Sequence, residues 1–303
     1  MGLYRLLAEL HVRPHPGDSI ASMPRAIVHV GPHKTGSTSL QTTLVRERAT
    51  LLAQDNLAIL PDSIPGGTKW RTAKAGINVA VCLGGQETTH FNCTKVLHYF
   101  EEFLEDARRA RRGIILSSEE FDRPRVAEKL AATLRGFEST IAIVHRPYFD
   151  WVRSVYTQIS SGSRPATLSE FVSADRIRDA AASLDDNSVS VYRRYAQQFS
   201  NVSMRPLGQG YVADFMCLDV GANATCRKLK ASPEVHKNVR GIEFIGNTSC
   251  MPASRKDLLW TVSVGIEAQA QALMGSASNV TEMLAELRTG FARAPYPVCA
   301  DER

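Results

Sequence analysis

The chain has 303 residues, of which 44% are hydrophobic and 22% are charged, values that are ordinary for a soluble globular protein. The net charge of +5 is mild, so it suits an anionic ligand and does not require nucleic acid as a partner. No run approaches the roughly 18 apolar residues that span a bilayer, and the first residues are too charged for a signal-peptide core. We therefore expect no transmembrane helix and no nucleic-acid partner.

Residues 1–23 read as a tail and residues 24–303 as one domain, in which apolar strands alternate with helical patterns. Strands are predicted at 25–31, 56–61, 113–118, 140–145 and 201–207. Helices are predicted at 37–54, 94–112, 125–137, 148–160, 189–199, 254–274 and 279–291. Residues 62–94 hold five glycines, four of them in the pairs Gly66–Gly67 and Gly84–Gly85, and are predicted to form a long excursion that is part of a substrate wall. The alternation favours a three-layer α/β fold with a mainly parallel sheet and a largely helical C-terminal third.

The first predicted strand leads into a glycine-containing turn and a helix, in the sequence AIVHVGPHKTGSTSLQTTL. Gly31 and Gly36 have the spacing of a Walker A loop, but Ser37 occupies the lysine position of that motif and a lysine stands at Lys34. Backbone N–H groups at such a helix N-terminus can face an anion. The hydroxyl groups of Ser37 and Thr38 add donors in the first turn. The alternative is an ordinary turn with a solvated lysine.

The segment GPHKTGSTSLQ resembles the 5′-phosphosulfate-binding loop of sulfotransferases that use 3′-phosphoadenosine 5′-phosphosulfate (PAPS). In that family a lysine occupies the position of Lys34. The resemblance covers about residues 26–218 and implies a P-loop-like fold with PAPS as co-substrate and no metal. It assigns the 5′ phosphosulfate to the loop residues Lys34, Thr35, Gly36, Ser37 and Thr38, and it assigns a catalytic role to Lys34.

A second motif follows the predicted strand 140–145, where Arg146 ends the strand and Ser154 lies eight residues later on the next helix. An arginine and a helix serine can hold one phosphate from two sides. The pair resembles the family's 3′-phosphate motif, although Pro147 directly follows Arg146 without the usual intervening residue. The alternative for Arg146 is a structural salt bridge.

The strand at 113–118 ends in the sequence SSEE, which resembles a segment of carbohydrate-type sulfotransferases. Transfer to an alcohol needs a general base, and we expect Glu119 to serve because strand-end residues point into the crevice. Glu120, His33 and His145 are rival bases. An acidic residue that only stabilises a helix N-terminus is the structural alternative.

The cysteines and asparagines bear on the compartment. Cys82 with Cys93 and Cys217 with Cys226 are close enough in sequence for short disulfide loops, although free thiols in a cytosolic enzyme would also fit. Cys250 and Cys299 are the other two cysteines. Five of nine asparagines open an N-x-[ST] sequon, where chance gives about one or two; they are Asn92, Asn201, Asn223, Asn247 and Asn279. This excess favours a glycoprotein in the secretory lumen, in the Golgi, over a cytoplasmic protein.

The sequence thus predicts transfer of a sulfuryl group from PAPS to an acceptor hydroxyl or amine, with a glycan as the expected acceptor. Two alternatives stay open. One is a P-loop kinase or NTPase, which would need a lysine after Gly36 and a magnesium-binding aspartate at a strand end. The other is a non-catalytic nucleotide-binding protein on the same fold.

Overall fold

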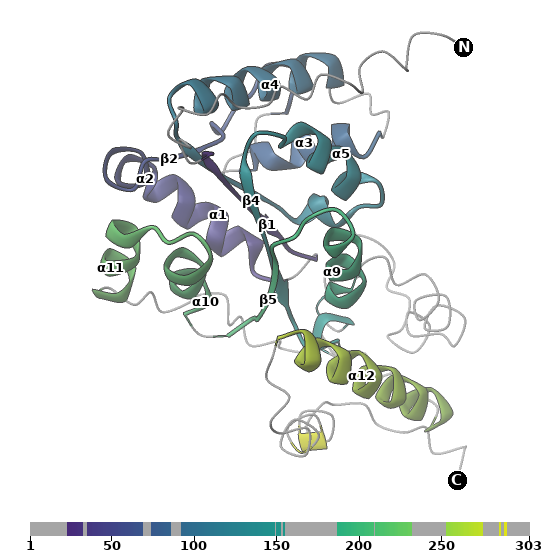
Figure 1. Cartoon of the computed structure of the whole chain (residues 1–303). Coiled ribbons are helices and arrows are strands. Elements are labelled where there is room, and N and C mark those ends of the chain that lie inside the picture. The colour runs from purple at the N-terminus through teal and green to yellow at the C-terminus, as the bar shows by residue number, and fades with distance from the viewer. Residues whose placement is uncertain are drawn as a thin grey trace, which may run out of the picture.

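The structure is a computed structural model that describes residues 23–32, 35–68, 74–85, 92–148, 150–152, 154, 187–208, 210–231, 253–274, 285, 288 and 289. Its centre is a five-stranded sheet with the order β2-β3-β1-β4-β5, in which every neighbouring pair is parallel (Figure 1). The strands are β1 (Arg25–Val30), β2 (Leu57–Ile59), β3 (Gly113–Ser118), β4 (Glu138–His145) and β5 (Val202–Pro206). This confirms the predicted parallel α/β class.

Helices cover both faces of the sheet, so the fold has the three layers that the sequence predicts (Figure 1). One layer contains α3 (Ala75–Leu83), α4 (Cys93–Arg109), α5 (Val126–Thr133), α9 (Ser188–Ala196) and α12 (Ala253–Leu273). The other contains α1 (Ser37–Arg46), α2 (Arg48–Gln54), α10 (Tyr211–Asp214), the π-helix η2 (Phe215–Asp219) and α11 (Asn223–Ala231). The central strand β1 places Val28 in the first core and Ile27 in the second, which explains its continuous apolar run.

The strand register brings three strand ends together. Val30, the last residue of β1, lies opposite Ser118 at the end of β3 and opposite Ile143 near the end of β4. Residues that follow these strands therefore emerge at one edge of the sheet, which we call the carboxyl edge. The predicted site residues all belong to segments that follow β1, β3 or β4.

The predicted helix 37–54 is two helices, because the chain bends at Glu47 between α1 and α2. The Glu47 side chain is only 1% exposed and accepts hydrogen bonds from Lys228 Nζ at 2.6 Å and Arg46 Nε at 2.9 Å. Burial raises the pKa of Glu47, but the bonds from Lys228 and Arg46 lower it more, so the net pKa lies below the usual value. The bend thus places a carboxylate where α11 can pair with it.

The predicted excursion contains a helix that the sequence analysis missed. All nine residues of α3 are buried, so this segment of the excursion is part of the core. A Cβ atom added at Gly76 would lie 2.4 Å from the Ser117 carbonyl oxygen, so glycine is what lets α3 approach the end of β3. Residues 69–73 and 86–91 of the excursion lie outside the described residues.

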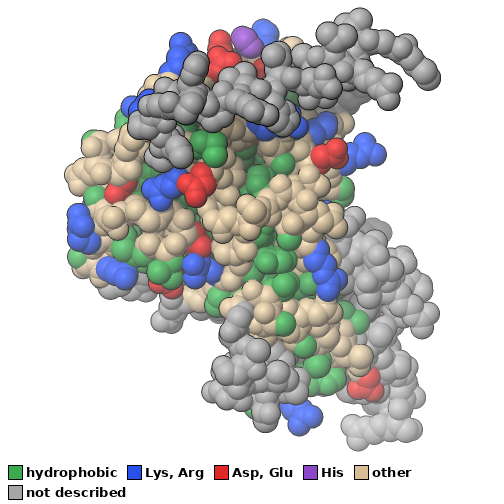
Figure 2. All heavy atoms as spheres, in the orientation of Figure 1, with side chains coloured by type: hydrophobic (Ala, Val, Ile, Leu, Met, Phe, Trp, Pro, Cys, Tyr) green, Lys and Arg blue, Asp and Glu red, His purple; other side chains and the backbone are tan. Residues whose placement is uncertain are grey.

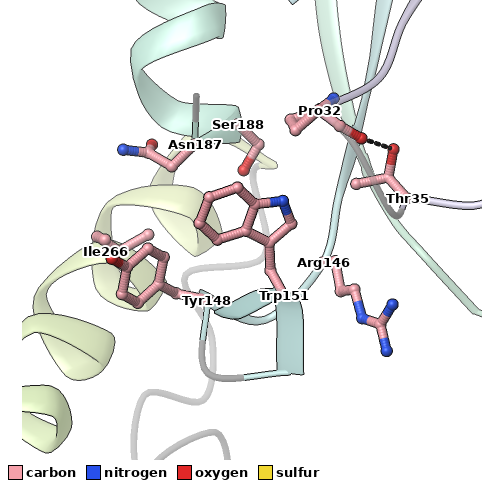
Figure 3. A pocket seen from close by; sticks show the side chains of 8 residues that line it. All are labelled: Pro32, Thr35, Arg146, Tyr148, Trp151, Asn187, Ser188 and Ile266. Carbon is pink, nitrogen blue, oxygen red and sulfur yellow. Dashed lines mark hydrogen bonds between the residues drawn. The ribbon is translucent and has the colours of Figure 1, made fainter. Parts of the chain in front are cut away.

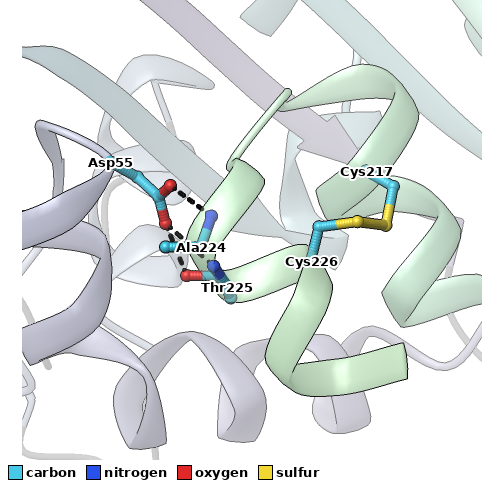
Figure 4. The surroundings of a disulfide bond; sticks show 5 residues. All are labelled: Asp55, Cys217, Ala224, Thr225 and Cys226. Carbon is cyan, nitrogen blue, oxygen red and sulfur yellow. Dashed lines mark hydrogen bonds between the residues drawn. A yellow bond between two sulfur atoms is a disulfide. The ribbon is translucent and has the colours of Figure 1, made fainter. Parts of the chain in front are cut away.

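Both predicted disulfide loops are confirmed. Cys82–Cys93 joins the end of α3 to the start of α4, and Cys217–Cys226 joins η2 to α11. Beside the second disulfide, the Asp55 carboxylate accepts bonds from the Ala224 N–H at 2.8 Å and the Thr225 N–H at 3.1 Å (Figure 4). Asp55 therefore caps the start of α11. Cys250 and Cys299 lie outside the described residues.

The surface shows how the small positive charge is distributed. On the face drawn in Figure 2, Lys and Arg side chains lie scattered among acidic ones and do not merge into one broad basic patch. Within the described part of the chain, no helix is both long and apolar enough to cross a membrane. The N-terminal tail and most of the predicted helix 279–291 fall outside the described residues, so both stay predictions.

Candidate active site

The loop after β1 is tightly folded around two glycines. A Cβ atom added at Gly31 would lie 2.6 Å from Thr35 Oγ1 and 2.9 Å from Ser37 Oγ, so any larger residue there would displace these two hydroxyl groups. Gly36 has a φ of +84°, a left-handed conformation that favours glycine. The Thr35 hydroxyl donates to the Pro32 carbonyl at 2.7 Å and closes the turn. His33 and Lys34 lie outside the described residues.

The loop is anchored by Tyr211 of α10, which lies in the same layer as α1 and which the sequence analysis did not single out. The Tyr211 hydroxyl donates to the Gly36 carbonyl, which also accepts the Ser39 N–H at 2.9 Å. Burial raises the pKa of Tyr211, so its hydroxyl keeps the proton that it donates. The start of α1 is thereby held in position at the carboxyl edge.

The first turn of α1 has the properties of an anion site. It contains no acidic residue, and its N-terminal N–H groups carry the positive end of the helix dipole. Ser37 is 6% exposed, and its hydroxyl has no hydrogen-bond partner among the described residues. Thr38 is exposed beside it. An oxyanion at this turn would meet a buried hydroxyl together with backbone donors.

The second predicted motif lies next to the loop. A pocket is lined by residues of the β1–α1 loop together with Arg146 and residues of three helical segments (Figure 3): Pro32, Thr35, Arg146, Tyr148, Trp151, Asn187, Ser188 and Ile266. The rings of Tyr148 and Trp151 stack with their centroids 5.7 Å apart. The structure therefore brings Arg146 and Thr35 to one pocket. Ser154 is helical and half-buried but does not line this pocket.

Glu119, directly after β3, is held from two sides. Gln41 Nε2 donates to Glu119 Oε2 at 3.0 Å, and Lys74 Nζ lies 3.3 Å from Glu119 Oε1. Burial raises the pKa of Glu119, but its own backbone N–H, Gln41 and Lys74 together lower the pKa below the usual value. The side chain is thus a carboxylate at neutral pH, the form that a general base requires.

The rival bases are placed differently. Glu120 pairs with Arg123, the residue directly after the short 3₁₀ helix η1 (Glu119–Asp122). His145 is buried with both ring nitrogens engaged, one 2.6 Å from Ser188 Oγ and the other against the Glu267 carboxylate. His33 lies outside the described residues. Among the described candidates, Glu119 has the position that suits a base.

His29 is a buried polar residue below the loop that sequence analysis also missed. Its Nδ1 lies 2.9 Å from Ser117 Oγ, and its ring meets Phe215 edge-on with centroids 5.7 Å apart. Burial lowers the pKa of His29 to about 4, although the nearby Glu119 charge raises it. His29 is therefore neutral at physiological pH and is one of the buried residues beside the β1–α1 loop.

Sequence signals for the missed residues differ. Gln41 lies four residues after Ser37, so helical spacing alone puts it on the same face of α1. Lys74 and Tyr211 have no such signal, because their place depends on how distant segments pack. In the described part of the chain, no three His, Cys, Asp or Glu side chains gather in a way that could hold a metal ion.

No protein-family model matches the chain, and no curated protein sequence matches it. Among solved structures, a sulfotransferase from Alicyclobacillus acidocaldarius aligns over 84% of this chain and 96% of its own, with 16% identity and a TM-score of 0.44. A likeness this remote assigns neither a family nor an activity.

Proposed function

We propose that the protein is a sulfotransferase that moves a sulfuryl group from PAPS to an acceptor hydroxyl or amine. The observation that carries this proposal is the meeting of three features at the carboxyl edge of one parallel sheet. These are the tight loop before α1, Arg146 at the neighbouring pocket, and the ionised Glu119. Parallel α/β sheets bind ligands at this edge.

Each predicted residue has a role in the proposed reaction. The amides and hydroxyls of Gly36, Ser37 and Thr38 would cradle the 5′ phosphosulfate, with Lys34 on the bridging oxygen. Arg146 and Ser154 would bind the 3′ phosphate. The acceptor oxygen or nitrogen forms a bond to sulfur while the sulfur–oxygen bond to the phosphate breaks. Glu119 takes the acceptor proton, and 3′-phosphoadenosine 5′-phosphate (PAP) leaves.

The features of the loop and of β3 favour sulfuryl transfer over the two alternatives. A kinase loop carries its lysine after the second glycine, and here that position is Ser37. The strand β3 ends in Ser117 and Ser118, so no aspartate stands at its end to hold magnesium. A non-catalytic nucleotide-binding protein would have no need for a carboxylate fixed by Gln41 and Lys74.

We also propose a place in the lumen of the secretory pathway, such as the Golgi, with the cytoplasm as the alternative. Two disulfides suit an oxidising compartment. The sequon asparagines Asn92, Asn201 and Asn223 are exposed, so glycans could occupy them. Asn247 and Asn279 lie outside the described residues.

Thermal unfolding with PAP or with ATP and magnesium separates the enzyme classes. At a concentration 100 times its dissociation constant, a ligand stabilises the folded state by about 2.7 kcal/mol. We expect PAP to raise the melting temperature and ATP with magnesium to leave it unchanged. Stabilisation by ATP with magnesium alone would contradict the proposal and support the kinase alternative.

The acceptor class needs a direct assay. We expect sulfur-35 from labelled PAPS to appear in a product when the protein is offered a panel of glycans, tyrosyl peptides and small alcohols. A glycan is the expected acceptor because the SSEE segment resembles carbohydrate-type enzymes. Labelling of peptides or alcohols alone would move the acceptor to another class, and an unlabelled panel with intact PAP binding would favour the non-catalytic alternative.

A further inference from the structure

Lys74 is held in place because both ends of the following helix, α3, are fixed by contacts. It is the residue directly before the helix, and two residues later Gly76 packs against the Ser117 carbonyl at the end of β3. The other end of α3 is tied to α4 by the Cys82–Cys93 disulfide. These contacts therefore hold the start of α3, including Lys74, against the end of β3, directly before Glu119.

The Glu119 carboxylate is gripped by two elements from different layers. Lys74 before α3 contacts Oε1 at 3.3 Å, and Gln41 on α1 donates to Oε2 at 3.0 Å. The Lys74 side chain is 23% exposed and that of Glu119 is 13% exposed, so solvent screens this pair less than a surface pair. A carboxylate with one donor on each oxygen cannot rotate freely.

We propose that Lys74 is a positioning residue of the transfer reaction, which orients the Glu119 carboxylate together with Gln41 and keeps it ionised at the lower end of the working pH range. This inference rests on the proposed function, in which Glu119 accepts the acceptor proton. Lys74 would act through Glu119 and not on the substrate itself.

The charges around Glu119 make Lys74 the contact to test. From β1 comes His29, which is neutral at physiological pH, and from α1 comes the uncharged Gln41. η1 itself also carries Glu120, which pairs with Arg123 directly after the helix, and the buried Asp122. Against the opposing effect of burial, Lys74 lowers the pKa of Glu119 by its charge and by its hydrogen bond. Removal of this ammonium group should therefore raise the pKa of Glu119.

The direct test follows the titration of Glu119 in the full-length protein. Glutamate carboxyl carbons are labelled with carbon-13, and the Glu119 signal is identified by its loss in Glu119→Gln. We expect the midpoint to move to higher pH in Lys74→Met and to stay close to the parent value in Lys74→Arg. The matched control is Lys129→Met, because Lys129 is an exposed lysine on α5 away from this site. If Lys74→Met does not fold, Lys74→Gln takes its place.

A kinetic test separates positioning from general support of the fold. Glu119 must be ionised to act, so the rate falls as pH drops through its pKa. In Lys74→Met this acid limb of kcat against pH should move to higher pH, and in Lys129→Met it should not move. A lower rate at every pH with an unmoved limb would indicate a merely structural role and overturn the inference.

The two tests fail in different ways. If no acceptor in the panel is sulfated by the parent protein, the proposed function fails, while the carboxyl titration still measures the pair. If sulfation occurs and the Glu119 midpoint is the same in parent and Lys74→Met, the inference fails and the function stands.

Discussion

The two edges of the sheet use charged side chains in different ways. At the amino edge, where β3 begins, Arg108 Nη2 donates to the Thr133 carbonyl at 3.0 Å and to the Arg135 carbonyl at 2.9 Å. The same guanidinium lies 4.8 Å from the centre of the Phe137 ring. The Arg108 guanidinium thereby holds the end of α4 to the segment that leads into β4, so its role is structural.

At the carboxyl edge, polar groups are left without protein partners. His29 Nε2, Ser37 Oγ and Gln41 Oε1 are buried and have no hydrogen bond to any described residue. A buried polar atom without a partner costs about 1–3 kcal/mol, so such groups concentrate where a ligand or water completes them. At the amino edge Arg108 Nε is also buried without a described partner, so an unpaired atom alone does not mark a site. The carboxyl edge differs because its three unpaired groups come from one strand–loop–helix unit beside the ionised Glu119.

The largest expected effect concerns Glu119. Glu119→Gln keeps the size of the side chain and removes its basicity, so kcat should fall by roughly 10²–10⁴-fold while PAP binding stays near the parent value. Steady-state kinetics with the acceptor found in the panel would measure this. Glu120→Gln is the matched control, because Glu120 pairs with Arg123 and should leave kcat almost unchanged. Reversed effects would move the base one residue along the chain.

The next effect concerns Arg146, whose pocket adjoins the loop. A charge-assisted hydrogen bond contributes about 1.5–3 kcal/mol, so Arg146→Ala should weaken PAP binding at least about ten-fold. Calorimetric titration gives the affinity. The control ligand is adenosine 5′-phosphosulfate, which lacks the 3′ phosphate and should bind parent and variant equally. Unequal binding of this ligand would count against a direct contact between Arg146 and the 3′ phosphate.

Much of this edge could be predicted from sequence because its parts are local. Apolar runs mark β1, β3 and β4, and parallel pairing brings their carboxyl ends together whatever the remaining chain does. The short distance along the chain between Cys82 and Cys93, and between Cys217 and Cys226, likewise indicated two disulfide loops, although the cysteines alone fitted free thiols equally well. Thr35 and Arg146, 111 residues apart, meet at one pocket for the same reason.

The missed features depend on contacts between distant segments. The sequence AGINVAVCL of α3 is buried on every side, so it shows no helical periodicity and the sequence predicts only an excursion there. Lys74 reaches Glu119 only because that helix docks on β3. At the break between α1 and α2, Glu47 pairs with Lys228, which lies 181 positions later. Local propensity carries no information about such pairs.

The pKa of His29 allows a test of how dry its buried surroundings beside the β1–α1 loop are. Burial lowers its pKa to about 4, against 6.5 for an ordinary histidine. Between these values the unfolded chain binds the proton and the folded chain does not, so stability falls as pH decreases from about 6.5 toward 4. From pH 7 to pH 5 this linkage amounts to about 2 kcal/mol. Urea unfolding of His29→Gln at both pH values should lack this loss.

The control for that experiment is His98→Gln. His98 lies on α4 with a side chain that is 71% exposed, so its removal should leave the pH dependence of the parent protein in place. If His29→Gln and the parent lose equal stability between pH 7 and pH 5, His29 is not held neutral by burial. Water would then reach His29 more readily than its burial in the structure indicates.

The smallest effect tests the amino edge. Arg108→Ala removes two bonds to backbone carbonyls and the contact with Phe137, so we expect a loss of about 1 kcal/mol in the free energy of unfolding. Arg109→Ala is the matched control, since Arg109 is exposed and its pair with Asp106 should contribute less than about 0.5 kcal/mol. Urea unfolding measures both. Neither variant should change kcat, because the amino edge lies at the far end of the strands from the proposed site. A loss of transfer activity in a stable Arg108→Ala protein would break the separation between the two edges.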